Sequence, residues 1–247
     1  MILLYNVYLD DKIREPGLYD RGLYKNYSSV DTFKYALASV VDIYPWKKVI
    51  INVVLNPTIL NQKEDLFSYI KTLFCSYDLD LNDKRCEYQN DWKELYSKLD
   101  DNLIYFCCNH DHVFIDSDSN NFIKAVSEFR QEFADKEATL YFSHWPEVNN
   151  IFLNREDVIT KETFSFSKDH NFDSIQIITK KVYHRWWFTG EFNHMFLPRT
   201  DYFTGTIPTQ YDKFQAVPHR EFFKHFDGYS HLPRLMHNTS LQAQACK

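Results

Sequence analysis

Apolar residues gather in short runs that alternate with amphipathic segments over the first half of the chain. Continuous apolar runs predict buried strands at residues 1–9, 47–55, 103–108 and 139–142. Between them, apolar residues recur at helical spacing over residues 29–43, 61–74, 90–99 and about 120–136. Strands that are apolar throughout are typical of a mostly parallel sheet covered on both faces. The pattern therefore predicts an α/β fold with a Rossmann-like central sheet flanked by helices.

Local signals support several of these boundaries. Ser28 or Ser29 is placed to cap the first helix, and Asp118 precedes the helix that begins near residue 120. Pro57 ends the second strand. A further short apolar run, residues 113–115, follows the polar segment at 109–112 closely enough to form an additional strand.

After residue 145 the pattern loosens. We expect short strands near 157–167 and 173–188, then irregular chain, and a short helix near 219–226. No repeat, low-complexity tract or linker separates the halves. We therefore expect one domain over residues 1–247, in which an irregular α+β C-terminal part, with room for antiparallel strands, extends the first half.

Composition excludes several classes of nucleotide-binding protein. The chain has only 5 glycines and contains neither a G-x-G-x-x-G nor a Walker A loop. This argues against dinucleotide-binding Rossmann proteins, P-loop NTPases and methyltransferases that bind S-adenosylmethionine. The net charge of −6, without any basic stripe, argues against nucleic acid as the main partner. The aromatic share of 17% suits a protein that handles carbohydrate, because sugars stack on aromatic faces.

The sequence gives no signal for export or membrane insertion. The apolar N-terminal run is too short for a signal peptide and lacks a basic region before it. We expect no transmembrane segment, although contact with a membrane surface stays open. The five cysteines lack zinc or redox spacing, so we expect free thiols in a reducing cytoplasm.

The strongest local signal is Asn109-His110-Asp111-His112, which follows a buried strand directly. Ligand sites of open α/β sheets form beyond the carboxyl ends of strands. A carboxylate held there can grip a divalent cation, and the cation can bind a diphosphate and offset charge on a leaving group. Histidine beside it suits Mn²⁺ better than Mg²⁺.

The order of elements, with this polar turn between two apolar strands, resembles the GT-A fold of nucleotide-sugar glycosyltransferases and their D-x-D motif. The resemblance covers roughly residues 1–145. A strict D-x-D supplies two carboxylates, whereas here His110 stands at one of those positions. The resemblance implies Mn²⁺ or Mg²⁺ as cofactor, with Asp111 as a metal ligand and His112 as the second.

The same resemblance implies that residues 1–145 bind the nucleotide-diphosphate sugar donor. The implied donor-binding residues lie at the end of the first strand and after it, before the first helix, before the third strand and in the motif itself; they are Tyr8, Arg14, Lys25, Arg85, Asn109 and His110. Arg14 and Lys25 are the candidates for phosphate contact. Residues 146–247 would then bind the acceptor, a glycan or another molecule with a hydroxyl group.

Two aromatic segments suit an acceptor site. Trp186 and Trp187 precede Gly190 and Glu191, and Asp201 follows ten residues later. In inverting GT-A enzymes a carboxylate in this part of the chain deprotonates the acceptor hydroxyl, so the resemblance implies Glu191 as the base, with Asp201 as the alternative. His144 and Trp145 follow the fourth strand and would also line this site.

The C-terminal part contains three histidines that suit a further metal ligand: His219, His225 and His231. GT-A enzymes often take such a ligand from a C-terminal histidine. The sequence does not choose among the three, and His219 is the first of them.

Two other functions compete with this one. Asn109-His110-Asp111 is similar to one segment of the metallophosphoesterases, but the D-x-H and G-D-x-x-D segments of that family are missing. A carbohydrate-binding or structural protein on a degenerate transferase fold is the non-enzyme alternative, which the histidine in the D-x-D position keeps open.

Overall fold

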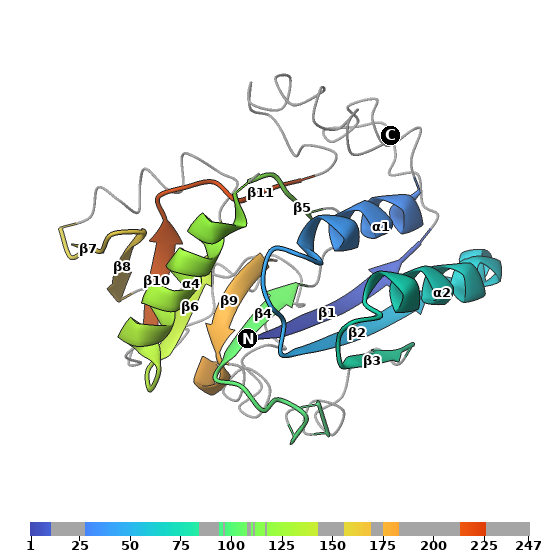
Figure 1. Cartoon of the computed structure of the whole chain (residues 1–247), viewed down its shortest axis with the longest axis horizontal. Coiled ribbons are helices and arrows are strands. Elements are labelled where there is room, and N and C mark those ends of the chain that lie inside the picture. The colour runs from blue at the N-terminus through green and yellow to red at the C-terminus, as the bar shows by residue number, and fades with distance from the viewer. Residues whose placement is uncertain are drawn as a thin grey trace, which may run out of the picture.

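A computed structural model describes residues 1–10, 28–83, 94–95, 97–107, 110, 112–116, 118–142, 156–168, 175–182 and 213–225. Within these ranges, nine strands form one sheet in the order β3-β2-β1-β4-β9-β6-β10-β8-β7, and two more form the ribbon β11-β5 (Figure 1). The strands are β1 (Ile2–Leu9), β2 (Lys48–Leu55), β3 (Leu79–Asn82), β4 (Leu103–Cys107), β5 (His112–Phe114), β6 (Glu137–Tyr141), β7 (Ile159–Thr160), β8 (Phe164–Lys168), β9 (Ile175–Thr179), β10 (Lys213–Pro218) and β11 (Phe223–His225).

The sheet is mostly parallel at its centre. β1 pairs in parallel with β2 and β4, β2 with β3, and β6 with β10. β9 lies antiparallel between β4 and β6, and β8 lies antiparallel to both β10 and β7. The expected α/β class is therefore confirmed, and strands from the second half of the chain complete the sheet that the first half begins.

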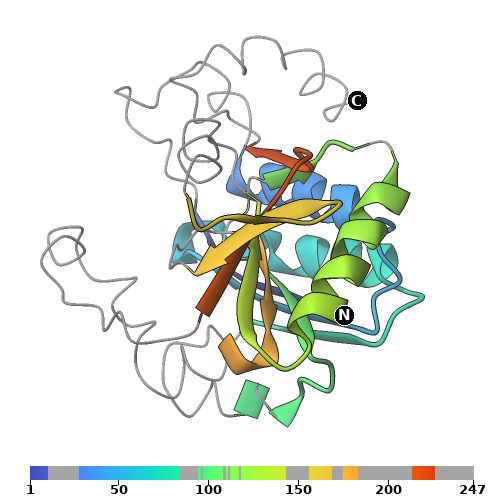
Figure 2. The same ribbon diagram turned by 90° about the vertical axis from the view of Figure 1, so that its left-hand side faces the viewer.

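Three helices cover one face of this sheet: α1 (Ser29–Val40), α2 (Lys63–Leu73) and α4 (Ser119–Phe133) (Figures 1 and 2). Ser28 caps α1, with its side chain accepting a hydrogen bond from the Asp31 N–H. Asp118 caps α4 in the same way, through the Asn120 N–H at 3.0 Å. A 3₁₀ helix, η2 (Pro57–Gln62), leads into α2. The predicted caps are thus confirmed.

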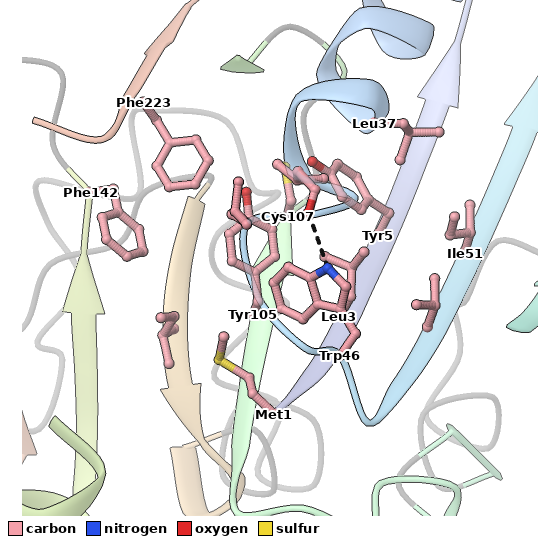
Figure 3. Close-up of a cluster of buried hydrophobic side chains, with 14 of the residues drawn as sticks. Met1, Leu3, Tyr5, Leu37, Trp46, Ile51, Tyr105, Cys107, Phe142 and Phe223 are labelled. Atoms are coloured by element: carbon pink, nitrogen blue, oxygen red, sulfur yellow. Dashed lines mark hydrogen bonds between the residues drawn. The ribbon is translucent and has the colours of Figure 1, made fainter. Parts of the chain in front are cut away.

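The core under the helices is strongly aromatic. Tyr5 of β1 lies 6.2 Å from Tyr105 of β4, and Tyr105 lies 5.8 Å from Phe223 of β11, measured between ring centroids (Figure 3). Trp46 packs on Tyr105, and its indole N–H donates to the Val40 carbonyl at 3.0 Å. Burial raises the pKa of both tyrosines well above the ordinary value, so both phenols stay neutral.

The opposite face of the sheet, called the second face below, is buried as well. Side chains alternate along each strand, so Ile2 and Leu4 of β1 point away from the helices, and both are fully buried. Ile104 of β4 and Ile178 of β9 continue this second apolar layer. Burial on both faces explains why the strands of the first half read as continuous apolar runs.

Three elements differ from the expectation. The strands β3 and β10 lie in segments where the sequence pattern predicts no strand. The helix expected near 219–226 is wrong, because residues 223–225 form β11 and pair antiparallel with β5. That pairing joins segments more than a hundred residues apart, so local periodicity does not report it.

No helix in the described ranges is long and apolar enough to cross a membrane. Cys75 is exposed and Cys107 is buried, and neither forms a disulfide with a described residue.

A partly buried ion-pair network ties the first residue to the start of β4. The Asp101 carboxylate accepts from the Met1 amino group at 3.1 Å, from Arg130 of α4 at 2.9 Å and from the Leu103 N–H at 2.9 Å. Burial alone would raise the pKa of Asp101, but these three donors together hold it below the ordinary value. The carboxylate therefore stabilises the fold above the ordinary carboxyl pKa, and that contribution is lost as pH falls through the lowered pKa.

We predict that Asp101→Asn lowers the free energy of unfolding by about 1–3 kcal/mol at neutral pH. The loss of stability on acidification should also become shallower, because the variant has no carboxylate to protonate. Chemical denaturation at neutral and acidic pH measures both effects. Asp100→Asn is the control: Asp100 is exposed and pairs with Lys47 at the surface, so little change is expected. Equal losses in the two variants would contradict the prediction.

Candidate functional site at the carboxyl ends of β1 and β4

The candidate site begins where two neighbouring parallel strands end and the chain leaves them in opposite directions. From β1 the chain proceeds to β2 on one side, and from β4 it proceeds to β6 on the other. Open α/β sheets bind ligands outside the carboxyl ends of strands where the strand order reverses in this way. The register pairs Tyr5 with Cys107, so Tyr8 and His110 each follow that pair by three residues along the chain.

Tyr8 is held at this edge by Asn56, which follows β2. The Asn56 amide donates to the Tyr8 hydroxyl at 2.7 Å, and the Asn56 N–H donates to the Leu9 carbonyl at 2.7 Å. The Asn56 side chain also accepts from the Thr58 N–H at the start of η2. Tyr8 is 37% exposed, so its ring and hydroxyl face solvent at the edge where the predicted donor site lies.

A row of asparagines crosses the second face just inside this edge. Asn6 of β1 pairs with Asn52 of β2, which pairs with Asn82 of β3. The Asn6 Oδ1 atom is buried, and among the described residues it accepts no hydrogen bond. Most buried polar atoms have a partner, so an unpaired acceptor beside a candidate site is a place where a ligand N–H or O–H fits.

The N-terminus of α1 also meets this edge, but its capping side chains are already used. The Ser29 hydroxyl bonds to both the N–H and the carbonyl of Asp10. Ser28 and Asp31 cap each other's backbone N–H groups, and Asp31 puts a negative charge in the first turn. A helix start that is capped by a carboxylate is a poor cradle for phosphate, because the charge repels it.

The predicted metal motif lies only partly within the described residues. His110 is half-buried, and His112, the first residue of β5, is 1% exposed. Asn109 and Asp111 lie outside the described residues. Among the residues that are described, no group of three His, Cys, Asp or Glu side chains could hold a metal ion. A cation site here would therefore depend on Asp111.

The ribbon that carries His112 brings one C-terminal histidine to it. β5 and β11 are antiparallel, and their register places residue 225 directly opposite His112. Directly opposite residues of such a pair have neighbouring Cβ atoms. The Ile115 N–H donates to the Phe222 carbonyl at 2.8 Å, and the Phe114 N–H donates to Ser39 of α1 at 2.9 Å. The ribbon is thereby anchored to the end of α1 (Figure 1).

An ion pair closes the base of this ribbon. Asp116, whose side chain is 2% exposed, lies 2.9 Å from Arg220 in the segment between β10 and β11. Its other carboxylate oxygen accepts from the Asp118 N–H at 2.9 Å, at the start of α4. Asp116 therefore links the motif segment, the C-terminal segment and α4.

His219 has a different setting from His112. It follows β10, its N–H donates to the Thr163 carbonyl, and its Nε2 atom lies 2.9 Å from the Ser165 hydroxyl of β8. The contact with Ser165 engages Nε2, which leaves Nδ1 as the ring atom for any further ligand.

The remaining predicted site residues lie outside the described part of the chain and stay predictions. They are the donor-site residues Arg14, Lys25, Arg85 and Asn109, the acceptor-site residues His144, Trp145, Trp186 and Trp187, and the carboxylates Asp111, Glu191 and Asp201.

Sequence reasoning overlooked Asn6 and Asn56. The signal for Asn6 was present, because a single polar residue interrupts an otherwise apolar strand. Asn56 carried a weaker signal, as an asparagine between a strand and Pro57 that is typical of a cap.

No protein-family model and no curated protein sequence matches the chain. Among solved structures it is similar to 4-diphosphocytidyl-2C-methyl-D-erythritol synthase from Anaerococcus prevotii DSM 20548, with a TM-score of 0.42 and 14% identity over 98% of this chain and 96% of the other. It is also similar to CTP:phosphocholine cytidylyltransferase from Streptococcus pneumoniae, with a TM-score of 0.42 and 13% identity over 98% of both chains.

An apo UDP-glucose pyrophosphorylase has a TM-score of 0.37 and 10% identity over 73% of this chain and 79% of its own. Likeness at this level does not assign a function to the chain.

We predict that Arg220→Gln lowers the free energy of unfolding by about 1–2 kcal/mol, because it leaves the buried Asp116 carboxylate without its ion pair. Amide hydrogen exchange should rise at Ile115, whose N–H bridges to Phe222. The control is Lys124→Gln, which breaks an exposed pair with Glu162 and should change stability by less than about 1 kcal/mol. Unchanged exchange at Ile115 would show that the ion pair does not hold the ribbon.

Proposed function

We propose that the protein is a metal-dependent glycosyltransferase that moves a sugar from a nucleotide-diphosphate donor to a hydroxyl acceptor, with inversion at the anomeric carbon. The observation that carries the proposal is the divergence of the chain at the neighbouring carboxyl ends of β1 and β4. The polar segment 109–112 follows β4 directly, and Tyr8 follows the same register on β1. The point where the chain leaves β1 and β4 in opposite directions and the polar segment thus lie at the same edge of the sheet, the carboxyl edge.

The described residues beside β1 suit the uncharged part of a nucleotide. Asn6 Oδ1 can accept from a base N–H or a ribose hydroxyl, because no described residue donates to it. Tyr8, held by Asn56, offers an exposed aromatic ring and a hydroxyl for the same part of the donor. These two residues would fix the nucleoside, and Arg14 and Lys25 would contact the phosphates.

The phosphate charge needs a separate source of compensation. The chain has no glycine-rich loop, and Asp31 occupies the start of the helix after β1. A divalent cation bound by Asp111, with His112 and a C-terminal histidine, would balance the diphosphate charge and stabilise the leaving nucleotide. The register of the ribbon makes His225 the first of the three C-terminal histidines to test, ahead of His219.

The acceptor side of the proposal rests on the second half of the chain. Glu191, or Asp201 in its place, would accept the proton of the acceptor hydroxyl as that oxygen attacks the anomeric carbon. His144, Trp145, Trp186 and Trp187 would supply the polar and aromatic surface that holds the acceptor.

The first experiment measures thermal stability with UDP-, GDP- and TDP-sugars, each with and without Mn²⁺. A rise in melting temperature that needs both nucleotide and metal supports the transferase. Stabilisation by free glycans alone would instead support a carbohydrate-binding protein. A parallel incubation of CTP or UTP with sugar phosphates tests nucleotidyl transfer, in which pyrophosphate is released. Pyrophosphate release without glycosyl transfer would overturn the proposal.

Asp111→Ala should abolish metal-dependent nucleotide stabilisation and turnover together, because the cation loses its carboxylate. His225→Gln should weaken Mn²⁺ binding if the ribbon completes the site, and His219→Gln and His231→Gln test the other two candidate ligands in the same way. Calorimetric titration of Mn²⁺ into each variant gives the readout without requiring a substrate. Full Mn²⁺ affinity in Asp111→Ala would remove the metal from the proposal.

Glu191→Gln should lower turnover by about a hundredfold or more while donor binding is retained, because general-base catalysis contributes on that scale. Initial rates at saturating donor, with donor affinity measured separately, distinguish the two effects. If Asp201→Asn gives this result and Glu191→Gln does not, Asp201 is the base.

A further inference from the structure

A buried polar row crosses the second face of the sheet far from β1. The strand register aligns Ile104 of β4, Ile178 of β9, Thr139 of β6, Gln215 of β10 and Ser167 of β8 in one line. The row is apolar over β4 and β9 and becomes polar over the next three strands. This change occurs without any loss of burial: Thr139, Gln215 and Ser167 are 8%, 2% and 2% exposed.

The same strands remain apolar on the helix face. Ala138 and Leu140 of β6, Ala216 of β10 and Phe166 of β8 all belong to the core beneath the helices. Since side chains alternate along a strand, three neighbouring strands each place an apolar residue toward the helices and a polar one away from them. The polar row therefore belongs to the second face alone, because the three strands that supply it are apolar on their other side.

Two atoms of this row have no hydrogen-bond partner among the residues that the structure describes. The Gln215 Oε1 atom and the Ser167 Oγ atom are buried, and no described residue gives or takes a hydrogen bond with either. Buried polar side-chain atoms are rarely left in this state in folded proteins. An amide oxygen only accepts, so its partner must be an O–H or N–H, whereas a serine hydroxyl can both donate and accept.

The row continues toward the carboxyl edge of the sheet. Ser165, two residues from Ser167 on the same strand and face, is 2% exposed, donates to the Thr160 hydroxyl at 3.2 Å and lies 2.9 Å from His219 Nε2. His219 is exposed, so this end of the buried row lies beside a side chain that reaches solvent. Thr139, Gln215, Ser165 and Ser167 are all uncharged, which matches a ligand with hydroxyl groups and no net charge.

We propose that Gln215 and Ser167 bind hydroxyl groups of a neutral carbohydrate, and that this is the acceptor of the proposed transferase. A sugar hydroxyl donates to Gln215 Oε1 and accepts from the Ser167 hydroxyl, so one ligand group satisfies both atoms. Bound acceptor lies at β6, β10 and β8, and the nucleotide lies at β1. The identification as an acceptor rests on the proposed function, whereas carbohydrate binding at this row does not.

The test uses the full chain and a panel of neutral sugars: galactose, glucose, N-acetylglucosamine and lactose. Binding is followed by saturation-transfer NMR and by thermal shift. We expect at least one sugar to bind the wild type and the double variant Gln215→Met/Ser167→Ala to lose about tenfold or more in affinity. The variant should melt at the same temperature as the wild type or higher when no sugar is present, because it buries fewer unpaired polar atoms.

Thr179→Val is the matched control. Thr179 is equally buried, but its hydroxyl oxygen accepts from the Ala138 N–H at 3.2 Å on the helix side of the sheet. This variant should melt at a lower temperature and bind sugar as the wild type does. Should the double variant fail to fold, Ser167→Ala alone removes a single oxygen and tests the same contact.

Absence of binding across the whole panel would overturn the inference. Unchanged sugar affinity in the double variant would also overturn it. A double variant that melts at a lower temperature but binds sugar as the wild type does would indicate that the row holds an internal water instead. Sugar binding without any nucleotide binding would leave the carbohydrate site standing and remove the transferase. Metal-dependent nucleotide binding, together with unaltered sugar affinity in the double variant, would support the transferase and remove the carbohydrate site at this row.

Discussion

Strand β1 is paired in parallel along both of its edges, and the rest of the structure depends on that constraint. All eight of its residues pair with β2, and its first four pair with β4. Parallel strands need covered connections, so a strand held in this way must be buried on both faces. Leu3, Tyr5 and Val7 meet the helices, and Ile2 and Leu4 fill the second face. The pairing with β4 covers only Ile2–Tyr5. The last residues of β1 therefore extend beyond the paired part of β4, at the carboxyl edge of the sheet where the candidate site lies.

The two faces of the sheet then differ in chemistry. The helix face is closed by aromatic rings around Phe122 of α4 and Phe223 of β11. Phe122 packs edge to face on Tyr44 and on Phe223, and Phe223 also contacts Tyr105 of β4 and Phe142, which follows β6. The second face is apolar in the middle, over β1, β4 and β9, and polar at two places. One place is the asparagine row of β1, β2 and β3, and the other is the row of β6, β10 and β8. The proposed nucleotide and acceptor sites thus lie in two polar regions of the same face, with an apolar centre between them.

Much of this architecture could be predicted from local patterns, and the parts that could not share a physical cause. The strands β1, β2, β4 and β6 are mostly apolar because both of their faces are buried, and the helices α1, α2 and α4 show a single apolar side. The short edge strand β3 has only four half-buried residues, Leu79–Asn82, so its pattern gives no clear signal. The strand β11 exists because β5 lies beside it, and that partner is distant in sequence.

The candidate site was predictable to the extent that it follows a strand. The segment 109–112 could be found because an apolar run ends before it, and Tyr8 because it closes β1. Gln215 and Ser167 could not be found in this way, since each is an ordinary polar residue in its own segment. Their significance comes from the register, which places them opposite each other and beside Thr139. A site made by alignment across strands is invisible until the strand order is known.

The free-energy cost of unpaired buried polar atoms also differs between the helix face and the second face. The helix face also contains hydroxyls without a hydrogen-bond partner among the described residues, those of Tyr5 and Tyr105. Each belongs to a large ring whose burial contributes about 1.5–3 kcal/mol or more, which offsets a penalty of about 1–3 kcal/mol for the unpaired hydroxyl. Ser167 and Gln215 bury far less apolar area, so nothing comparable offsets their penalty. In a protein whose whole stability is of the order of 5–15 kcal/mol, such groups are a substantial cost to the free state. A ligand that pairs with them removes that cost, which gives the polar row a role in binding that it does not have in folding.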